Sequence, residues 1–241
     1  MSAKTFIAEL QKFASKRPRD EVASVQRFFK TGKGEYGEGD VLMGVRVPEI
    51  RQVCKMFADL SLAEIERLLE SPLHEAREGA LIIMANQAIK SKKDFAHQKA
   101  LYDLYIRRTD RINNWDLVDC SCRDVVGGYL INKPRDILYK LAKSQDMWER
   151  RIAIVSTWEF IRRGDLADTV KIAQMLLGDR EDLIHKATGW MLREAGKRDR
   201  AVLLTFLGTH AAHMPRTALR YAVEHLPLDQ KKTYMEAKKY A

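Results

Sequence analysis

Apolar residues recur at intervals of three and four along nearly the whole chain, which is the period of an amphipathic helix. Sustained alternation of apolar and polar residues, the pattern of a half-buried strand, does not occur. The pattern therefore predicts an all-α protein without a sheet. The expected helices begin near Ser2, Asp20, Pro48, Ser61, Glu75, Asp94, Asn113, Pro134, Asp146, Asp165, Glu181, Asp199, Pro215 and Leu228.

Six of these helices have a defined extent, at 75–90, 147–163, 181–197 and, roughly, 199–207, 215–225 and 228–240. Ser61 with Glu64 has the spacing of a capping box. The helices pair into hairpins that begin about 30–40 residues apart, which is near the period of helical repeats such as HEAT. We therefore expect one domain over residues 1–241, a curved α-α superhelix (HEAT-like or ARM-like solenoid) of about six to seven helical hairpins. Such an array presents a concave face, and on a basic chain this face could bind the rod-like DNA duplex.

One long segment, residues 31–46, departs from the helical pattern. It is rich in glycine and contains Glu35, Glu38 and Asp40. A phosphate-binding loop needs backbone N–H groups free of nearby carboxylates and a following Lys-Ser/Thr pair, so a P-loop is excluded. The segment is instead predicted to be a flexible connection or a lid.

The chain carries a net charge of +9 over 241 residues, which indicates an anionic partner. Nucleic acid is the first candidate for this partner and an anionic membrane the second. The alternative without a function is that Lys and Arg only keep the surface soluble. No apolar run approaches the roughly 18 residues that cross a bilayer, and the N-terminus lacks an apolar signal core, so membrane binding rests on charge alone. The three cysteines Cys54, Cys120 and Cys122 do not form a disulfide framework and fit a reducing cytoplasm.

The stretch from Asn113 to Asp119 is the most informative of the sequence. Asn113 or Asn114 can cap a helix, and a helix that starts there carries Trp115 and Asp119 on one face. Asp116 would face elsewhere, where it could complement the helix dipole. The bland alternative is that Trp115 packs between helices and Asp119 is solvated.

The helix at 181–197 carries a second Trp on a cationic stripe. Lys186, Trp190, Arg193 and Lys197 follow one another at helical spacing, opposite an apolar side. A Trp among three cations can offer a surface to a sugar or a base while the cations bind phosphates. The structural alternative is that a neighbouring helix covers Trp190, and that the aliphatic parts of the Lys and Arg side chains pack along the indole while their charged ends reach water.

Further cations stand near helix starts. Arg151, next to Arg150, shares a face with Val155 and Trp158, so its partner is either a structural carboxylate or a DNA phosphate. Arg216 follows Pro215 in the same manner. Basic residues thus recur near the starts of several helices, and this recurrence favours a groove that binds the phosphates of a DNA backbone.

The chain offers little else for catalysis. The six His do not form a metal set, since His210 and His213 lack a completing carboxylate, and the Cys120-x-Cys122 spacing lacks a second pair. We therefore predict neither a metal site nor a cofactor. A Ser or Cys nucleophile in a recognisable motif is missing as well, which leaves Asp119 as the best catalytic carboxylate.

Several motifs, in order along the chain, resemble the AlkD family of HEAT-like-repeat DNA alkylpurine glycosylases. They are Gly44-x-x-x-Pro48-Glu49-x-Arg51, Trp115-Asp116-Leu117-Val118-Asp119, Trp148-x-x-Arg151 and Lys186-Ala187-x-Gly189-Trp190-x-Leu192-Arg193-Glu194. The resemblance implies a curved all-α solenoid that holds duplex DNA in its cleft and removes N3-methyladenine and N7-methylguanine. We expect such a protein to be a monomer in the cytoplasm.

The resemblance also implies residue roles. Trp115 and Trp190 would embrace the deoxyribose of the damaged nucleotide, Asp119 would be the catalytic carboxylate, and Arg151 and Arg193 would bind phosphate. The N-terminal helices of the family often bring a Tyr to the cleft, whereas here the loosely matching Tyr36 lies in the acidic glycine-rich segment.

Two other functions stay open at this stage. One is a catalytically weak relative that holds branched or distorted DNA. The other is a HEAT-type protein scaffold, which would expose apolar patches on its concave face.

Overall fold

The computed structural model describes residues 1–91 and 93–237. Every regular element among these residues is a helix, and their only strand-like pairing is an isolated parallel bridge between Val41 and Leu73. The predicted all-α, helical-repeat fold class is confirmed. The chain groups into two compact units, Met1–Tyr129 and Leu130–Ala241, so a single domain stays a prediction.

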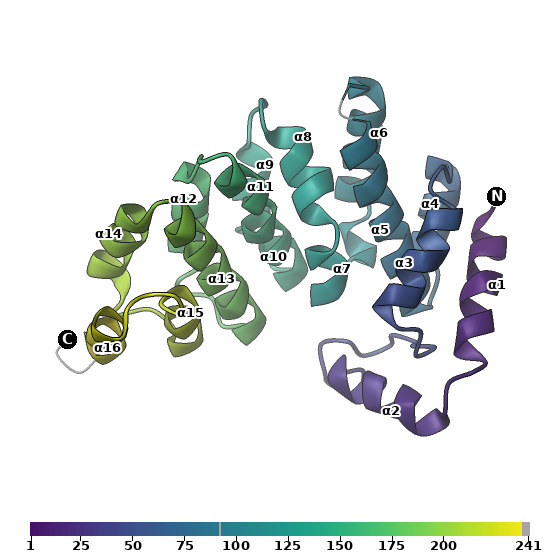
Figure 1. Cartoon of the computed structure of the whole chain (residues 1–241), viewed down its shortest axis with the longest axis horizontal. Coiled ribbons are helices and arrows are strands. Elements are labelled where there is room, and N and C mark those ends of the chain that lie inside the picture. Colours follow the sequence, from purple (N-terminus) through teal and green to yellow (C-terminus); the bar gives the residue numbers. More distant parts are fainter. Residues whose placement is uncertain (92, 238–241) are drawn as a thin grey trace. The chain divides into compact units, whose positions relative to one another are not determined.

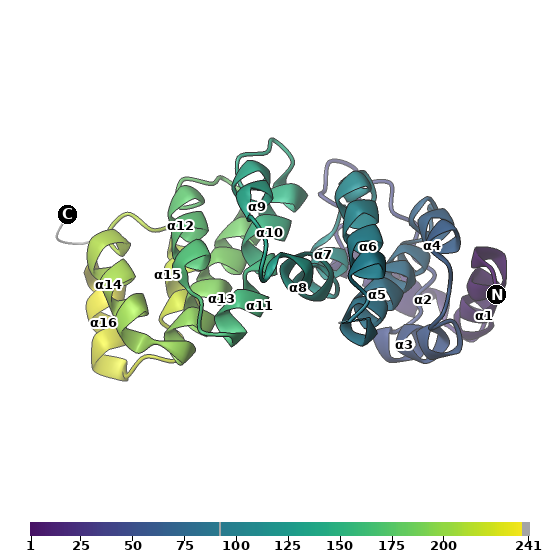
Figure 2. The ribbon, with the colours of Figure 1, turned by 90° about the horizontal axis from the view of Figure 1, so that it is seen from above.

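The first unit is built around α5, which packs against α3, α4 and α6 (Figures 1 and 2). Fourteen of its seventeen residues are buried, so this helix has hardly any solvent face. The helices of this unit are α1 (Ala3–Ala14), α2 (Arg19–Phe28), α3 (Val47–Met56), α4 (Leu62–Leu69), α5 (His74–Lys90), α6 (Phe95–Arg107) and α7 (Trp115–Asp119). A 3₁₀ turn, η1 (Thr109–Arg111), precedes α7, and a π-helical turn, η2 (Arg123–Gly127), follows it.

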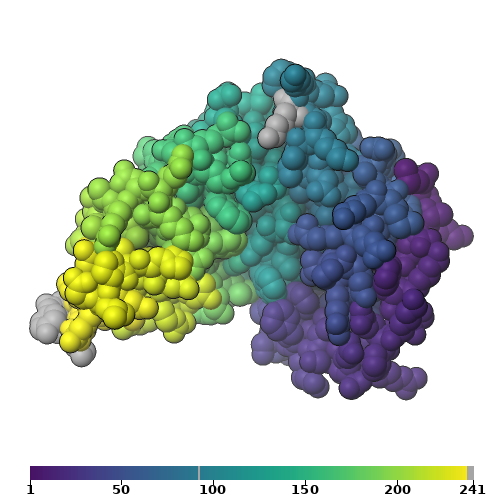
Figure 3. All heavy atoms as spheres, viewed as in Figure 1, coloured from purple at the N-terminus to yellow at the C-terminus, as the bar shows by residue number. Residues whose placement is uncertain are grey.

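α1 covers the N-terminal side of this core, against α3, α4 and α5 (Figure 3, purple). Its Phe6 ring lies so close to α5 that a Cβ at Gly79 would meet the ring at 2.4 Å. Glycine at this position therefore allows the two helices to approach.

In the second unit α13 occupies the central place, in contact with α10, α11, α12, α14 and α15. The helices of this unit are α9 (Asp136–Leu141), α10 (Met147–Ser156), α11 (Trp158–Arg162), α12 (Ala167–Met175), α13 (Asp182–Arg198), α14 (Arg200–His210), α15 (Arg216–Ala222) and α16 (Leu228–Glu236). A short helix, α8 (Gly128–Leu130), spans the point where the two units join in sequence.

Most helix starts lie where the capping residues predict them. Ser2, Asp94 and Asp146 each accept a hydrogen bond from a backbone N–H of the first turn, and Pro48 stands in the first turn of α3. The capping box predicted at Ser61 is only half formed, because Glu64 accepts instead from the N–H of Ala3 at 2.7 Å. This carboxylate thus joins α4 to α1.

Three other helices differ from the expected bounds or extend beyond the described residues. The helix predicted at 147–163 is divided at Thr157, whose hydroxyl donates to the Ile154 carbonyl at 2.7 Å. α12 begins at Ala167, two residues after the expected start at Asp165; Leu166 is its N-cap, and Asp165 pairs with Arg135 at 2.6 Å. The predicted last helix reaches Glu236, and its final predicted positions 238–240 lie outside the described residues.

Among the described residues, none of the helices has the length and apolarity to traverse a bilayer. Cys54, Cys120 and Cys122 are free thiols, in agreement with the expected lack of a disulfide framework. Burial raises the pKa of Cys54 to about 12, so this thiol is not a reactive nucleophile.

Candidate functional site

The short helix α7 presents the predicted Trp and carboxylate on one turn. Asn114 is its N-cap, and the side-chain oxygen accepts from the N–H of Trp115 at 2.8 Å. Leu117 and Val118 are buried, whereas Trp115 and Asp119 are half-buried. A helix of five residues cannot hold itself in place, so its position depends on the contacts that its side chains make.

Two phenylalanines at the end of α2 surround Trp115. The Phe29 ring stacks on the indole, with centroids 5.5 Å apart and an interplanar angle of 13°, and Phe28 meets it edge-on at 5.8 Å. Phe28 is 64% exposed, which is unusual for a large apolar side chain. The sequence analysis missed this pair, although two adjacent aromatic residues at a helix end, before the glycine-rich segment, were a visible signal.

The two carboxylates of α7 lie in different surroundings. Asp116 is buried and accepts from Nε2 of His74 at 2.7 Å, so it fastens α7 to α5, a partner that the sequence did not indicate. Asp119 lies one helical turn beyond Trp115 and is half-buried. Asp116 therefore joins α7 to α5, and Asp119 stands four residues after Trp115 at the end of the same helix.

A buried chain of charged groups continues beyond Asp116. Nδ1 of His74 bonds Asp40 at 2.8 Å, and Asp40 in turn accepts from Arg77 at 2.6 Å. Burial disfavours the imidazolium, but the hydrogen bonds to Asp116 and Asp40 raise the pKa of His74 to about 10. Burial likewise opposes ionisation of Asp40, yet the hydrogen bond from His74 and the charge of Arg77 lower the pKa of this carboxyl.

The second half of the glycine-rich segment 31–46 is held by residues of α5. The Glu75 carboxylate accepts from the N–H groups of Met43, Gly44 and Val45 at 2.7–3.2 Å. Gly44 has a φ of +81°, which L side chains rarely adopt. The segment is therefore a connection that α5 holds through Asp40 and Glu75.

In the second unit, Trp190 lies on α13 and is half-buried against Trp158, with ring centroids 5.0 Å apart. The neighbouring Gly189 is in tight contact with α15, since a Cβ there would meet the Ala218 carbonyl oxygen at 2.3 Å. The Gly-Trp pair of the sequence thus combines a close helix contact with an indole on the adjacent position of the helix.

The predicted cations of α13 all have acidic neighbours. Lys186 pairs with Asp182 at 2.9 Å, and Lys197 with Glu194 at 2.8 Å. Arg193 pairs with Glu224 and, at 3.3 Å, with Glu194. These pairs are at least partly exposed, so water and salt screen them and a phosphate can compete for the cation.

The other predicted cations are held more firmly. Arg150 donates to both oxygens of Asp179, at 2.6 and 3.2 Å, and to the carbonyls of Ser144 and Gln145. Arg151 is buried and donates to the Leu183 carbonyl at 2.6 Å. The exposed Arg216 donates to the Met235 carbonyl at 2.6 Å. Their DNA contacts stay predictions.

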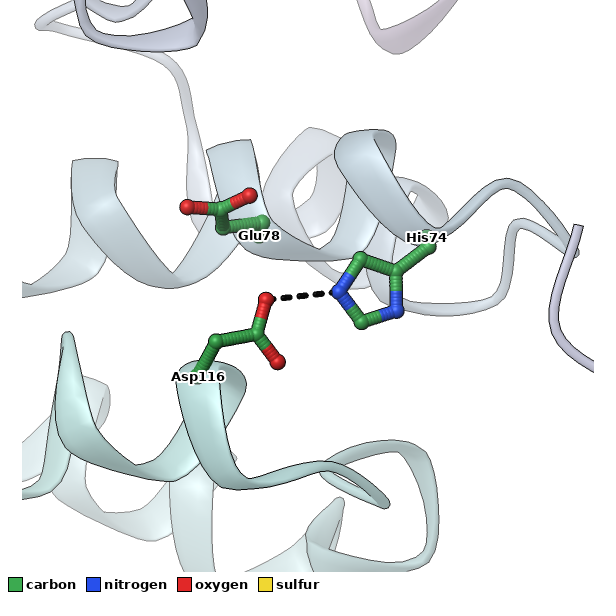
Figure 4. Close-up of side chains that lie close together, drawn as sticks. All are labelled: His74, Glu78 and Asp116. Atoms are coloured by element: carbon green, nitrogen blue, oxygen red, sulfur yellow. Dashed lines mark hydrogen bonds and ion pairs between the residues drawn. The ribbon is translucent and has the colours of Figure 1, made fainter. Parts of the chain in front are cut away.

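Trp115 and Asp119 belong to the first unit, whereas Trp190, Arg151 and the other predicted cations belong to the second. A shared site made of both sets also stays a prediction. A further cluster that the sequence analysis missed lies entirely in the first unit, where His74, Glu78 and Asp116 come together (Figure 4). His74 and Asp116 are too far apart in sequence for any motif to reveal the pair.

Comparisons with known proteins agree with these motifs. The chain is similar in fold to a solved structure described as a predicted DNA alkylation repair enzyme from Enterococcus faecalis, with a TM-score of 0.66 at 16% identity over 88% of this chain and 97% of that one. None of the curated proteins matches the chain. Residues 7–226 match the family described as DNA alkylation repair enzyme. This match covers nearly the whole sequence, and the chain therefore belongs to the DNA alkylation repair enzyme family.

Proposed function

We propose that the protein is a DNA glycosylase that hydrolyses the N-glycosidic bond of cationic alkylated purines, N3-methyladenine and N7-methylguanine, in duplex DNA. Family membership supports a role in DNA repair. The observation that carries the proposal is the geometry of α7, in which Trp115 and Asp119 stand four residues apart on one helix whose other carboxylate, Asp116, binds His74.

The chemistry needs few groups. A cationic purine is already a good leaving group, so no general acid is required. Cleavage builds positive charge on the sugar, as in glycoside hydrolysis. A fixed Asp119 carboxylate stabilises this charge and positions the attacking water, and the indole faces of Trp115 and Trp190 add cation–π stabilisation.

Binding to DNA is assigned to the basic side chains of the second unit. Arg193 and Lys197 line a pocket of about 100 Å³ together with Arg200 and His225, so four basic groups gather at one place that a phosphate could enter. Arg151, Lys186, Arg150 and Arg216 complete the proposed set of DNA contacts. The excess of positive charge supports this assignment, because phosphate contacts supply most of the affinity for duplex DNA.

The direct test measures release of N7-methylguanine from a duplex oligonucleotide. Asp119→Asn should retain DNA binding but lower the release rate by about 10²–10³, the effect of removing one fixed charge-stabilising group. Trp115→Ala and Trp190→Ala should also weaken release. Asp103→Asn changes an exposed carboxylate of the same unit, paired with Lys99, and should leave release unchanged.

Unchanged release by Asp119→Asn would remove this residue from the mechanism. One observation favours a second function, a catalytically weak protein that holds branched DNA: Phe29 already stacks on one indole face of Trp115. Tight binding of junction DNA by the wild-type protein, without release of any alkylated base, would establish that alternative.

A further inference from the structure

We propose that His74, Glu78 and Asp116 form a binding site for a divalent transition-metal cation of the Zn²⁺ class in the first unit. Each residue offers one ligand atom, and these atoms all lie within 4.8 Å of one another. Figure 4 shows the Asp116 carboxylate, from α7, joined to the imidazole, and the Glu78 carboxyl, from the same helix as His74 and one turn on, above Asp116. One imidazole nitrogen and two carboxylate oxygens are donors that Zn²⁺ accepts, with water in a fourth position.

One oxygen of the cluster lacks a partner among the described residues. His74, Glu78 and Asp116 are only 1%, 4% and 9% exposed. Oδ1 of Asp116 is buried and accepts no hydrogen bond. Buried polar atoms nearly always have a partner, so this oxygen indicates a ligand that the protein itself does not supply.

The imidazole is oriented as a metal ligand usually is. Nδ1 of His74 faces Asp40, which Arg77 holds in place at 2.6 Å, so a carboxylate fixes the ring and leaves Nε2 toward the cluster. Such a carboxylate behind the second ring nitrogen is the common partner of a metal-bound histidine. A cation would take the place of the proton that Nε2 now shares with Asp116.

The local charge also favours a cation. In and around the cluster, buried carboxyl groups outnumber buried basic side chains by four to two. The carboxyl groups are those of Asp40, Glu75, Glu78 and Asp116, and the basic side chains are those of His74 and Arg77. A divalent ion would supply the missing positive charge, because buried charges are stable only when they are paired or bind a metal.

A cation at this position would bridge α5 and α7 beneath the indole. Asp116 is the chain neighbour of Trp115, and the Phe29 ring lies 5.0 Å from the His74 ring and 5.5 Å from Trp115. The ion would thus fix the short helix that carries Trp115 and Asp119 without touching a substrate. This structural role does not depend on the proposed glycosylase activity.

The test uses the full chain, freed of metal with a chelator and dialysed. Calorimetric titration with Zn²⁺ should show one tight equivalent, and Zn²⁺ should raise the melting temperature, whereas Mg²⁺, which prefers oxygen ligands only, should not. Co²⁺ at the same site should give the visible absorption of a low-symmetry, four- or five-coordinate complex.

Glu78→Gln removes one ligand with little change of shape, so the variant should fold. We expect it to weaken Zn²⁺ binding by at least about tenfold, since even outer-shell partners of a metal contribute that much. Asp116→Asn should do the same. His213→Gln, which changes an exposed histidine of the second unit, should leave the tight equivalent intact.

Three results would overturn the proposal. They are less than one tight equivalent in the wild-type protein, undiminished binding by both Glu78→Gln and Asp116→Asn, and loss of the tight equivalent in His213→Gln alone. The last result would place the zinc at surface histidines of the second unit.

Discussion

The two tryptophans assigned to the sugar are held in place by opposite means. Trp115 stands on a five-residue helix that long-range contacts position: Phe29 stacks on the indole, and Asp116 binds His74 of α5. Trp190 stands within a helix of 17 residues, where the backbone itself fixes the position and Gly189 sets the distance to α15.

The difference shows where each region is vulnerable. The position of α7 depends on buried charges, which are stable only while every partner is present. The position of α13 depends on volume, because its neighbours leave no room for even one carbon atom at Gly189. A change of charge should therefore damage the first region, and a change of size should damage the second.

The largest effect should come from Asp40→Asn. The side chains of Asp40 and Arg77 are both only 3% exposed, so neutralising the carboxylate leaves a buried guanidinium without its counter-charge and leaves His74 with Asp116 as its one carboxylate. We expect a loss of about 3 kcal/mol in the free energy of unfolding, measured by urea denaturation.

The matched control for that change is Asp182→Asn in the second unit, which removes an exposed partner of Lys186. It should cost less than about 1 kcal/mol, as exposed ion pairs do. Equal losses in the two variants would contradict the view that burial makes the first region sensitive to charge.

Gly189→Ala should have the next largest effect, because the obstacle is the backbone oxygen of Ala218 and not the end of a flexible side chain. Overpacking of this kind costs about 1–3 kcal/mol, and α13 would have to move away from α15. Gly208→Ala is the control: Gly208 also lies within a helix, but a Cβ there would meet nothing within 4 Å. That variant should gain up to about 1 kcal/mol from helix propensity, and a gain at both positions would show that α15 yields freely.

The same contrast explains how much the sequence could predict. Features set by a few neighbouring residues were predicted correctly, such as the caps Ser2, Asp94 and Asp146 and the Trp115–Asp119 face. Features set across the fold were missed. Asp116 accepts from His74 of α5, and Glu64 accepts from the N–H of Ala3 and not from the N-cap residue of its own helix. In both cases the donor comes from another part of the fold.

The division of the predicted 147–163 helix had a different cause. Its helical periodicity continues through the break, so the apolar pattern contained no signal of it. The turn at Thr157 arises from a hydroxyl that bonds to the backbone carbonyl three residues earlier, an alternative that Thr always offers and that only packing selects.

A smaller effect is expected for Asn114→Ala. The Asn114 side chain is fully buried and caps α7 with a 2.8 Å bond from the Trp115 N–H, so its removal should cost about 1 kcal/mol. Since α7 carries Trp115 and Asp119, base release should fall by more than this stability loss would explain. Ser61→Ala, at the exposed cap of α4 in the same unit, is the control and should leave release unchanged. An equal fall in both variants would mean that cap loss acts only through global stability.

The smallest effect, and the one confined to DNA binding, should come from Lys186→Ala. Lys186 is half-buried and makes only a screened pair with Asp182, so its loss should hardly change the free energy of unfolding. If it binds a phosphate, the slope of log K against log salt should fall by about 1. Arg150→Gln sharpens the comparison, since Arg150 is bonded to Asp179 and two carbonyls, and its loss should lower the free energy of unfolding in addition to any change of the salt slope. A salt slope that Lys186→Ala leaves unchanged would remove this lysine from the DNA contacts and leave Trp190 and Arg193 to define the binding face of α13.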